Sequence, residues 1–379
     1  MTHIFHLVLV QPCDLHRVSS YQAGQLRYLD YLAHVCALWR HIAISCSSLW
    51  RHIDVSPYGP GSSRLLARAA VYSERAGRVP IELHISDKEH NSLEGPPYPY
   101  KEIYQFLSHM ADCMETLEFV MTREFGGFQR NALSRLLLGQ RPTLRKLFVL
   151  SERDDFDTFI VDNDFIPGVL ERRSKHLPLG LKKEHLESRF APLTTLHLQG
   201  IFPLWSSTAY QRLVDLRLLS TSRRSHITEA KFIAILKSSP ELQILHFGLD
   251  IQETTPDTEQ ITPVDLQDLR VVKIFPFTNR NENTLSPSSV LRLLAPGTKS
   301  LWLSFNDFYE SDSIEELENF FARSRVTRFY ARFAFPPLSI FLQHAVQLEC
   351  VVFDRFIPGD YHEHSPHGYH WTERPQYQA

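Results

Sequence analysis

The stretch Leu193-Thr-Thr-Leu-His-Leu198 is followed by a second of the same form, Leu213-Val-Asp-Leu-Arg-Leu218. In both, leucine occupies the first, fourth and sixth positions. Because side chains of a strand alternate between its two faces, Leu196 and Leu198 share a face, and a polar residue between them points the other way. Each stretch therefore predicts a short strand with one apolar face buried.

The same pattern recurs along most of the chain. Amphipathic helical segments separate its instances; one such segment carries Ile103, Phe106, Leu107 and Met110 at helical spacing. The instances are Met114/Leu117/Phe119, Leu144/Leu147/Val149, Leu193/Leu196/Leu198, Leu213/Leu216/Leu218, Leu242/Leu245/Phe247, Leu269/Val272/Ile274, Thr298/Leu301/Leu303, Val326/Phe329/Ala331 and Leu348/Val351/Phe353. Most intervals are close to the roughly 20 to 29 residues typical of leucine-rich repeats.

A unit of one helix and one short strand cannot bury its own apolar face, so neighbouring units must stack. The predicted fold class is therefore α/β, with an irregular leucine-rich-repeat-like solenoid of parallel strands and outer helices over residues 60–355. The asparagine that usually follows the strand of such repeats is absent; Gln199, Leu219 and Gly248 occupy that zone. A generic α/β domain, in which the pattern reflects strand chemistry alone, is the alternative.

Three segments mark the limits of this repeat. Ser62 or Ser63 is placed to cap a helix, and residues 79–85 alternate as a half-buried strand does. Residues 151–190 break the period and predict a long surface insertion or an imperfect unit. Residues 356–379 have no periodicity, and we expect a disordered tail there.

An apolar region precedes the repeat at Tyr31–Val55, YLAHVCALWRHIAISCSSLWRHIDV. Leu32, Val35, Leu38 and Ile42 recur at helical spacing, and a Ser/Cys-rich turn leads to a second anchor at Trp50. A helix with so broad an apolar face must be covered by another surface.

This region resembles the second half of an F-box of the kind found in mushroom-type fungi. F-boxes are short helical modules that dock onto the adaptor subunit of a cullin–RING ubiquitin ligase. The matching positions are Val35, Cys36, Trp39, Arg40, Ile42, Ala43, Leu49, Trp50 and Ile53. Thr2-His3-Ile4-Phe5 is similar to the tail of the module's opening signature, whose Leu-Pro pair is absent. The predicted module over residues 1–55 is thus incomplete at its start.

The resemblance implies a substrate-recognition adaptor of an SCF-type ubiquitin ligase. Its implied partners are the ligase adaptor subunit, the cullin scaffold and an unidentified protein substrate. The residues implied at the ligase adaptor are Ile4, Phe5, Leu7, Val8, Val35, Leu38, Trp39, Leu49 and Trp50. The alternative is a non-catalytic interaction scaffold that has lost ligase coupling, in which the N-terminal helices cap the first repeat.

Composition excludes several other classes of partner. The chain has 40 basic and 43 acidic residues and a net charge of −3, which gives no electrostatic case for nucleic acid or an anionic membrane. No apolar run reaches the roughly 18 to 20 residues of a membrane-spanning helix, so we expect a soluble protein. The five scattered cysteines favour a reducing compartment, the cytoplasm or the nucleus.

No motif indicates chemistry. The sequence lacks G-x-S-x-G and H-E-x-x-H. The acidic run from Asp154 to Asp164 does not have the spacing of a calcium-binding loop. The tail histidines are placed only for adventitious zinc binding, and the nineteen histidines of the chain are too dispersed to nominate a base. We therefore predict no enzyme activity, no cofactor and no metal site.

Overall fold

The computed structural model describes residues 34–58, 62–87, 100–122, 126–151, 158–165, 175–220, 225–252, 262–275, 287–305, 314–332, 343 and 347–354. Within these ranges the chain is an α/β protein organised on an 11-stranded parallel sheet. In sheet order its strands are β1 (His52–Val55), β2 (Ile81–Ser86), β3 (Met114–Met121), β4 (Lys146–Ser151), β7 (Thr195–Gln199), β9 (Asp215–Leu219), β11 (Ile244–Gly248), β14 (Val271–Ile274), β16 (Leu301–Phe305), β17 (Val326–Arg332) and β18 (Cys350–Asp354).

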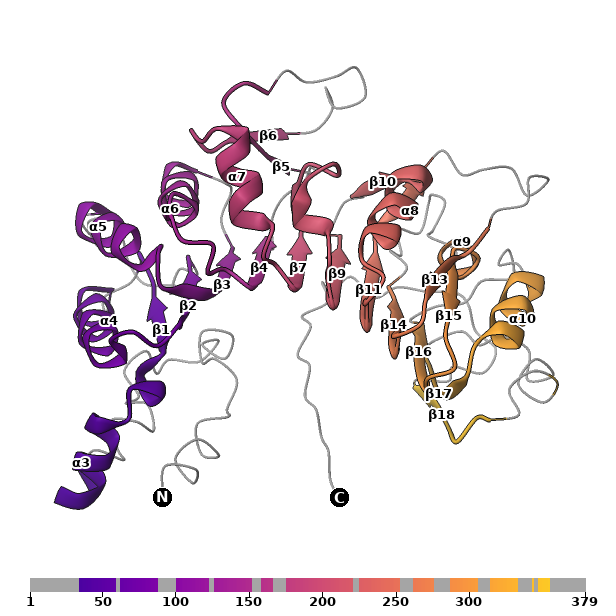
Figure 1. The fold of residues 1–379 in the computed structure, drawn as a ribbon, viewed down its shortest axis with the longest axis horizontal. Helices are drawn as coiled ribbons and strands as arrows, with labels where there is room; N and C mark the ends of the chain where they lie inside the picture. The colour runs from indigo at the N-terminus through magenta and orange to yellow at the C-terminus, as the bar shows by residue number, and fades with distance from the viewer. Residues whose placement is uncertain are drawn as a thin grey trace, which may run out of the picture.

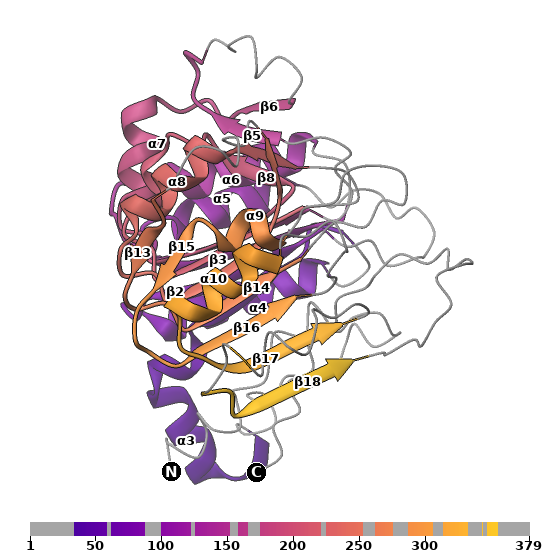
Figure 2. The same cartoon turned by 90° about the vertical axis from the view of Figure 1, so that its right-hand side faces the viewer.

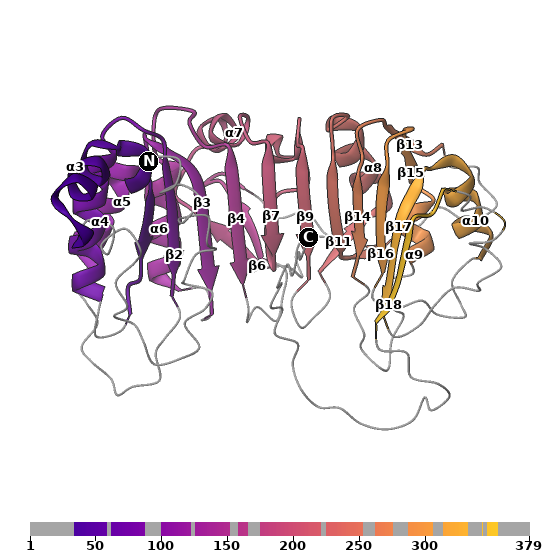
Figure 3. The ribbon, with the colours of Figure 1, turned by 90° about the horizontal axis from the view of Figure 1, so that it is seen from below.

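Helices cover one face of this sheet. They are α4 (Ser62–Ala76), α5 (Tyr100–Met110), α6 (Gly127–Leu137), α7 (Lys183–Phe190), α8 (Glu229–Ser238), α9 (Pro287–Leu291) and α10 (Ile314–Arg323), and a further helix, α3 (Ala37–Ser45), precedes them in the chain. The strands follow the inner side of an arch and α4 to α10 lie on its outer side (Figure 1). From below, the strands stand side by side from β1 to β18 (Figure 3).

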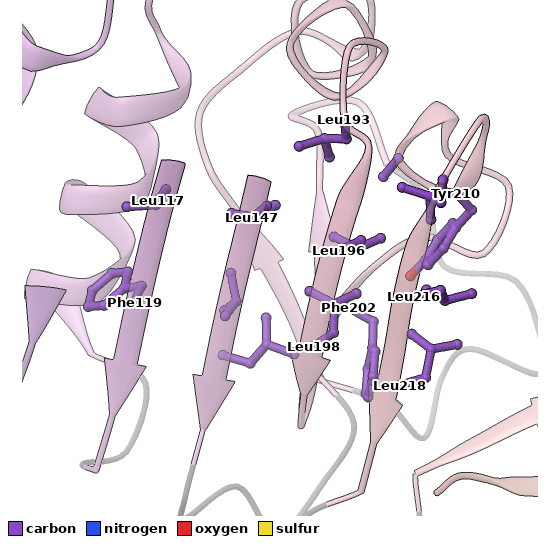
Figure 4. Close-up of a cluster of buried hydrophobic side chains, with 14 of the residues drawn as sticks. Leu117, Phe119, Leu147, Leu193, Leu196, Leu198, Phe202, Tyr210, Leu216 and Leu218 are labelled. Atoms are coloured by element: carbon purple, nitrogen blue, oxygen red, sulfur yellow. The ribbon is translucent and has the colours of Figure 1, made fainter. Parts of the chain in front are cut away.

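The apolar positions of the motif align from strand to strand. Leu83, Leu117, Leu147, Leu196, Leu216, Leu245, Val272, Leu303, Phe329 and Val351 are consecutive Cα partners. A second row, which includes Phe119, Leu198 and Leu218, runs beside it, and Figure 4 shows members of both rows among the buried side chains between the sheet and its helices. The predicted parallel pairing of the motifs is confirmed.

One instance of the motif was predicted two residues too early. Val272 and Ile274 pair with Leu303 and Phe305, not with Leu301 and Leu303. Leu301, Leu303 and Phe305 share one face of β16 because alternate residues do so. A period of two cannot tell which pair of the three is equivalent to its neighbours.

The predicted helices and the early strand are present. α4 begins at Ser62 and ends before Gly77, whose φ of 59° lies in the left-handed region that glycine adopts without strain. β2 begins two residues after the start of the predicted strand over residues 79–85 and ends one residue beyond it. Ile103, Leu107 and Met110 of the helix predicted at 103–110 are buried, and Phe106 is partly buried against the same core.

Residues 151–190 include elements of an imperfect unit. β5 (Thr158–Val161) pairs in parallel with β6 (Lys175–Pro178) and with β8 (Ile201–Pro203) in a separate three-stranded sheet. Leu177, Leu186 and Phe190 are buried, so this segment contributes to the core.

Two smaller sheets pair β10 (His226–Thr228) with β12 (Asp250–Gln252), and β13 (Val264–Leu266) with β15 (Leu294–Pro296).

The N-terminal end of the sheet includes residues of the predicted F-box-like module at 1–55. β1 pairs with β2, and Ile53 and Val55 are buried in the same core as the later strands. The predicted boundary between residues 55 and 60 therefore divides elements that pack together. α3 projects beyond the end of the sheet in both Figure 1 and Figure 2.

Among the described helices, none combines the length and apolar character that a membrane crossing requires. The predicted tail at 356–379 and the predicted opening signature at residues 2–5 lie outside the described residues.

Candidate functional site

The first candidate surface is the outer side of α3. Cys36 caps this helix, because its Sγ accepts a hydrogen bond from the Trp39 backbone at 3.5 Å. Val35 is 60% exposed and Leu38 is 55% exposed, while Trp39 is half-buried against the core. We refer to Val35, Leu38 and Trp39 as the α3 surface. Exposed apolar side chains of this size, at and just before a projecting helix, are suited to contact with another polypeptide.

Two of the predicted adaptor contacts lie elsewhere. Leu49 and Trp50 are buried, Trp50 completely. The Trp50 indole donates a hydrogen bond to the Ala43 carbonyl at 2.7 Å, and its ring meets Tyr72 of α4 edge to face at 5.0 Å. The 3-10 turn η2 (Ser47–Trp50) directs both side chains inward. This corrects the prediction for both residues, because they belong to the chain's own core.

The remaining predicted contacts divide into two groups. Ile4, Phe5, Leu7 and Val8 lie outside the described residues. Val35, Leu38 and Trp39 form the α3 surface. The prediction of an apolar partner-binding surface therefore rests on these three residues.

The second candidate surface is the sheet face opposite the core, on the inner side of the arch in Figure 1. Strand register aligns one row of side chains across it, which we call the inner row. Its members are Asp54, His84, Glu118, Phe148, His197, Arg217, His246, Lys273, Ser304, Tyr330 and Val352. Charged, imidazole and aromatic groups thus alternate along one line of the concave face.

Three side chains at the β1–β2 end of this face form a histidine–carboxylate cluster. His52, Glu82 and His84 each place one potential ligand atom within 4.8 Å of the others. The His52 Nδ1 lies 3.6 Å from Glu82 Oε2, and the two imidazole rings lie 4.0 Å apart between centroids. His84 is 8% exposed.

Further carboxylates orient the two imidazoles. The His52 Nε2 lies 3.2 Å from Asp54 Oδ1, and the His84 Nδ1 lies 2.6 Å from Glu118 Oε2. The His84 Nε2 is buried and has no hydrogen-bond partner among the described residues. One nitrogen of His84 is thus held by a carboxylate and its other nitrogen is left available.

Glu82 remains ionised over the whole ordinary pH range. Its hydrogen bond with His52 and its contact with the Arg51 guanidinium lower its pKa to about 2, against an opposing effect of burial. Arg51 also approaches Glu115 Oε2 at 3.6 Å. A carboxylate of such low pKa is available as an acceptor or as a ligand.

A second polar group lies further along the inner face. The His197 Nε2 is 3.0 Å from Asp215 Oδ2, and Arg217 contacts both Asp215 oxygens at 3.1 and 3.2 Å. Burial lowers the pKa of His197. Burial, together with the charges of Arg217 and Lys273, lowers the pKa of His246 to about 3. His246 is therefore neutral in the folded chain near pH 7.

Linear spacing does not predict these groups, because the histidines that form them are dispersed along the sequence. His52 and His84 are far apart in sequence and meet only through strand pairing. A usable signal was present: His84, His197 and His246 each occupy the polar position between the two apolar residues of a strand motif. Because aligned motifs place these positions in one row, alignment of the motifs predicts neighbours that linear spacing hides.

Comparison with known proteins assigns no function to these surfaces. No model of a known protein family matches the chain, and no curated protein matches it significantly.

Proposed function

We propose that the chain is a substrate-recognition adaptor of a cullin–RING ubiquitin ligase. In this proposal the α3 surface binds the ligase adaptor subunit, and the concave face of an irregular leucine-rich-repeat-like solenoid binds the target protein. The chain itself performs no chemistry. It raises the effective concentration of the target beside the ubiquitin-loaded enzyme, which is enough to accelerate transfer.

The exposure of Val35 and Leu38 carries the proposal. These side chains are 60% and 55% exposed. Leu38 lies on α3, which projects past the end of the sheet (Figure 1), and Val35 lies just before that helix begins. They fall within the segment that resembles an F-box. Apolar and aromatic anchors of this kind typically supply about 2 kcal/mol or more each when a partner covers them.

The inner row supports the second half of the proposal. It offers imidazole, guanidinium, carboxylate and aromatic groups in register along a concave face, where each is partly desolvated before a partner arrives. Lys273 lies over the Trp302 ring at 4.9 Å, and Phe148 meets His197 edge to face at 4.4 Å. Such pre-positioned side chains favour recognition of a protein surface, because little further ordering is needed on binding.

One observation favours a second candidate, a non-catalytic interaction scaffold without ligase coupling. Leu49 and Trp50, which belong to the F-box-like pattern, are committed to the core beside α4 and β1. The segment then serves as a cap on the first strand. In this second candidate the concave face still binds a protein, but the α3 surface has no ligase partner.

Affinity purification separates the two candidates. The full chain is expressed with an affinity tag in cells that contain the ligase adaptor and cullin, and both are quantified in the eluate. We expect the wild-type chain to retain the adaptor and the cullin. The amount of adaptor recovered with Leu38→Asp should be at least ten-fold lower. Val71→Asp is the matched control, because Val71 is an exposed apolar residue on α4 that is 42% exposed.

Equal recovery of the adaptor with Leu38→Asp and wild type would show that the α3 surface does not bind the adaptor. Absence of adaptor and cullin from the wild-type eluate, with other proteins retained, would favour the scaffold.

A further inference from the structure

We propose that His52, Glu82 and His84 bind a divalent transition-metal ion, with zinc as the best-fitting metal. The inference does not depend on the proposed ligase role. Two imidazoles and one carboxylate form a ligand set that zinc uses widely in proteins. The three residues lie on adjacent strands β1 and β2, so the sheet fixes their backbone positions.

The distances at the cluster suit such an ion. A tetrahedral zinc with bonds of about 2.0 to 2.2 Å holds its donor atoms roughly 3.3 to 3.5 Å apart. The His52 Nδ1 and Glu82 Oε2 are 3.6 Å apart, and all three donors fall within 4.8 Å of one another. Binding draws the donors together slightly and leaves a fourth position for water or an incoming group.

The nitrogen of His84 that would bind the metal is already identified by its surroundings. Its Nδ1 is paired with Glu118 at 2.6 Å, which leaves Nε2 as the free donor. That Nε2 is buried and without a hydrogen-bond partner among the described residues, and the residue is 8% exposed. A buried nitrogen without a partner is costly, and a metal ion on that nitrogen removes the cost.

The outer partners match those of metal-bound histidines. In metal sites the second ring nitrogen is usually held by a carboxylate, which fixes the tautomer and strengthens the ligand. Here Glu118 holds His84, and Asp54 holds His52 at 3.2 Å. Both imidazoles therefore have the support that metal-binding histidines need.

The local charge also favours a cation. Asp54, Glu82, Glu115 and Glu118 surround the cluster with carboxylates, whereas the nearby guanidiniums are those of Arg51 and Arg68. Carboxylates therefore outnumber guanidiniums around the cluster. A divalent ion balances this excess.

Zinc titration of the full chain tests the proposal. The four tail histidines His362, His364, His367 and His370 are first changed to glutamine, so that zinc bound by the tail does not mask binding at the cluster. On this background we expect one equivalent of Zn²⁺ to bind with a dissociation constant of micromolar or below, measured in competition with a chromophoric chelator. Co²⁺ in place of Zn²⁺ is expected to give the visible absorption of a four-coordinate site.

Variants on the same background assign the ligands. His84→Gln and Glu82→Gln should each weaken zinc binding by more than 100-fold, and Glu118→Gln by about 10- to 100-fold, as loss of an outer partner does. His197→Gln is the matched control, because His197 also pairs with a carboxylate on the inner face. Circular dichroism of each variant checks that it is folded. If His84→Gln does not fold, Glu82→Gln gives the ligand test.

Three results would overturn the proposal. These are no stoichiometric zinc on the background chain, binding only at millimolar zinc, and equal losses with Glu82→Gln and His197→Gln.

Discussion

Trp50 is the largest side chain in the fully buried core, and it ties α3 to α4 through one hydrogen bond and two ring contacts. Tyr72 meets its edge, and the Arg75 guanidinium lies 4.2 Å from its ring centroid. Loss of this residue therefore removes apolar burial, a hydrogen bond and a cation–π contact together.

Trp50→Ala should lower the free energy of unfolding by about 3 to 5 kcal/mol, because it leaves a large cavity in a close-packed site. Trp39→Ala, at a half-buried position, should cost less than half as much. Urea denaturation monitored by circular dichroism measures both. Equal losses for the two variants would contradict the assignment of Trp50 to the core.

His246 makes the free energy of unfolding of the chain depend on pH. Its folded pKa is about 3, and the unfolded value is near 6.5. Between these values the unfolded chain binds the extra proton, so this contribution to stability is complete above pH 6.5 and falls as the pH falls. His246→Asn should therefore lose less stability than wild type between pH 7.5 and pH 5.

The measurement is the free energy of unfolding of each protein at the two pH values. His109→Asn, at an exposed position on α5, is the control and should keep the wild-type slope. If the free energy of unfolding of His246→Asn falls between pH 7.5 and pH 5 as much as that of the wild type, other groups cause the acid sensitivity.

Residue types alone predicted which face of each strand is buried but not which apolar residues near the N-terminus are exposed. Leu38 and Trp50 have similar hydrophobicity and lie in the same segment, yet one is exposed and the other is not. The difference arises because η2 turns the chain into β1, and a tertiary contact with α4 then covers Trp50. No local pattern encodes that contact.

At the scale of the elements, two arginines, Arg189 buried and Arg323 half-buried, join successive helices. Arg189, near the end of α7, donates to the Ala111 carbonyl at 2.9 Å and the Leu136 carbonyl at 3.5 Å, and also to Arg141. Arg323, at the end of α10, donates to Leu291 at 2.8 Å and Leu294 at 2.9 Å. Both satisfy carbonyls at the ends of preceding elements, which would otherwise be buried without donors.

Arg189→Leu should lower the free energy of unfolding by about 2 to 4 kcal/mol, because it leaves buried carbonyls unpaired. Arg130→Leu, at an exposed position of α6, should change it by no more than about 0.5 kcal/mol. Urea denaturation of the two variants makes the comparison. A loss for Arg189→Leu as small as that for Arg130→Leu would show that water satisfies these carbonyls.

Long helices and strands are easier to predict from the sequence than short ones. α4, α5 and the strands with two apolar motif positions follow from periodicity, whereas β10, β12, β13 and β15 are three residues each and show no period. The register of β16 is ambiguous for another reason, because Leu301, Leu303 and Phe305 alternate and either consecutive pair fits the motif. Period-two patterns indicate the buried face but leave the pairing open by two residues.

At the scale of the whole molecule, parallel pairing of motifs from β1 to β18 makes one continuous core and two different surfaces. The apolar rows face the helices, and the inner row with its neighbours faces the hollow of the arch (Figure 1). α3 stands outside both layers at one end. Sequence periodicity predicted the stack, but the position of α3 and the histidine–carboxylate cluster follow from how the strands are aligned in space.

In the proposed ligase role, another polypeptide covers the α3 surface. Hydrogen–deuterium exchange of the full chain, with and without the purified ligase adaptor subunit, tests it most directly. We expect slower exchange in the peptides that span residues 34–48 when the adaptor is present, and unchanged exchange in α4 and in the strands of the concave face. Unchanged exchange in residues 34–48 at saturating adaptor, or protection confined to the concave strands, would contradict the account.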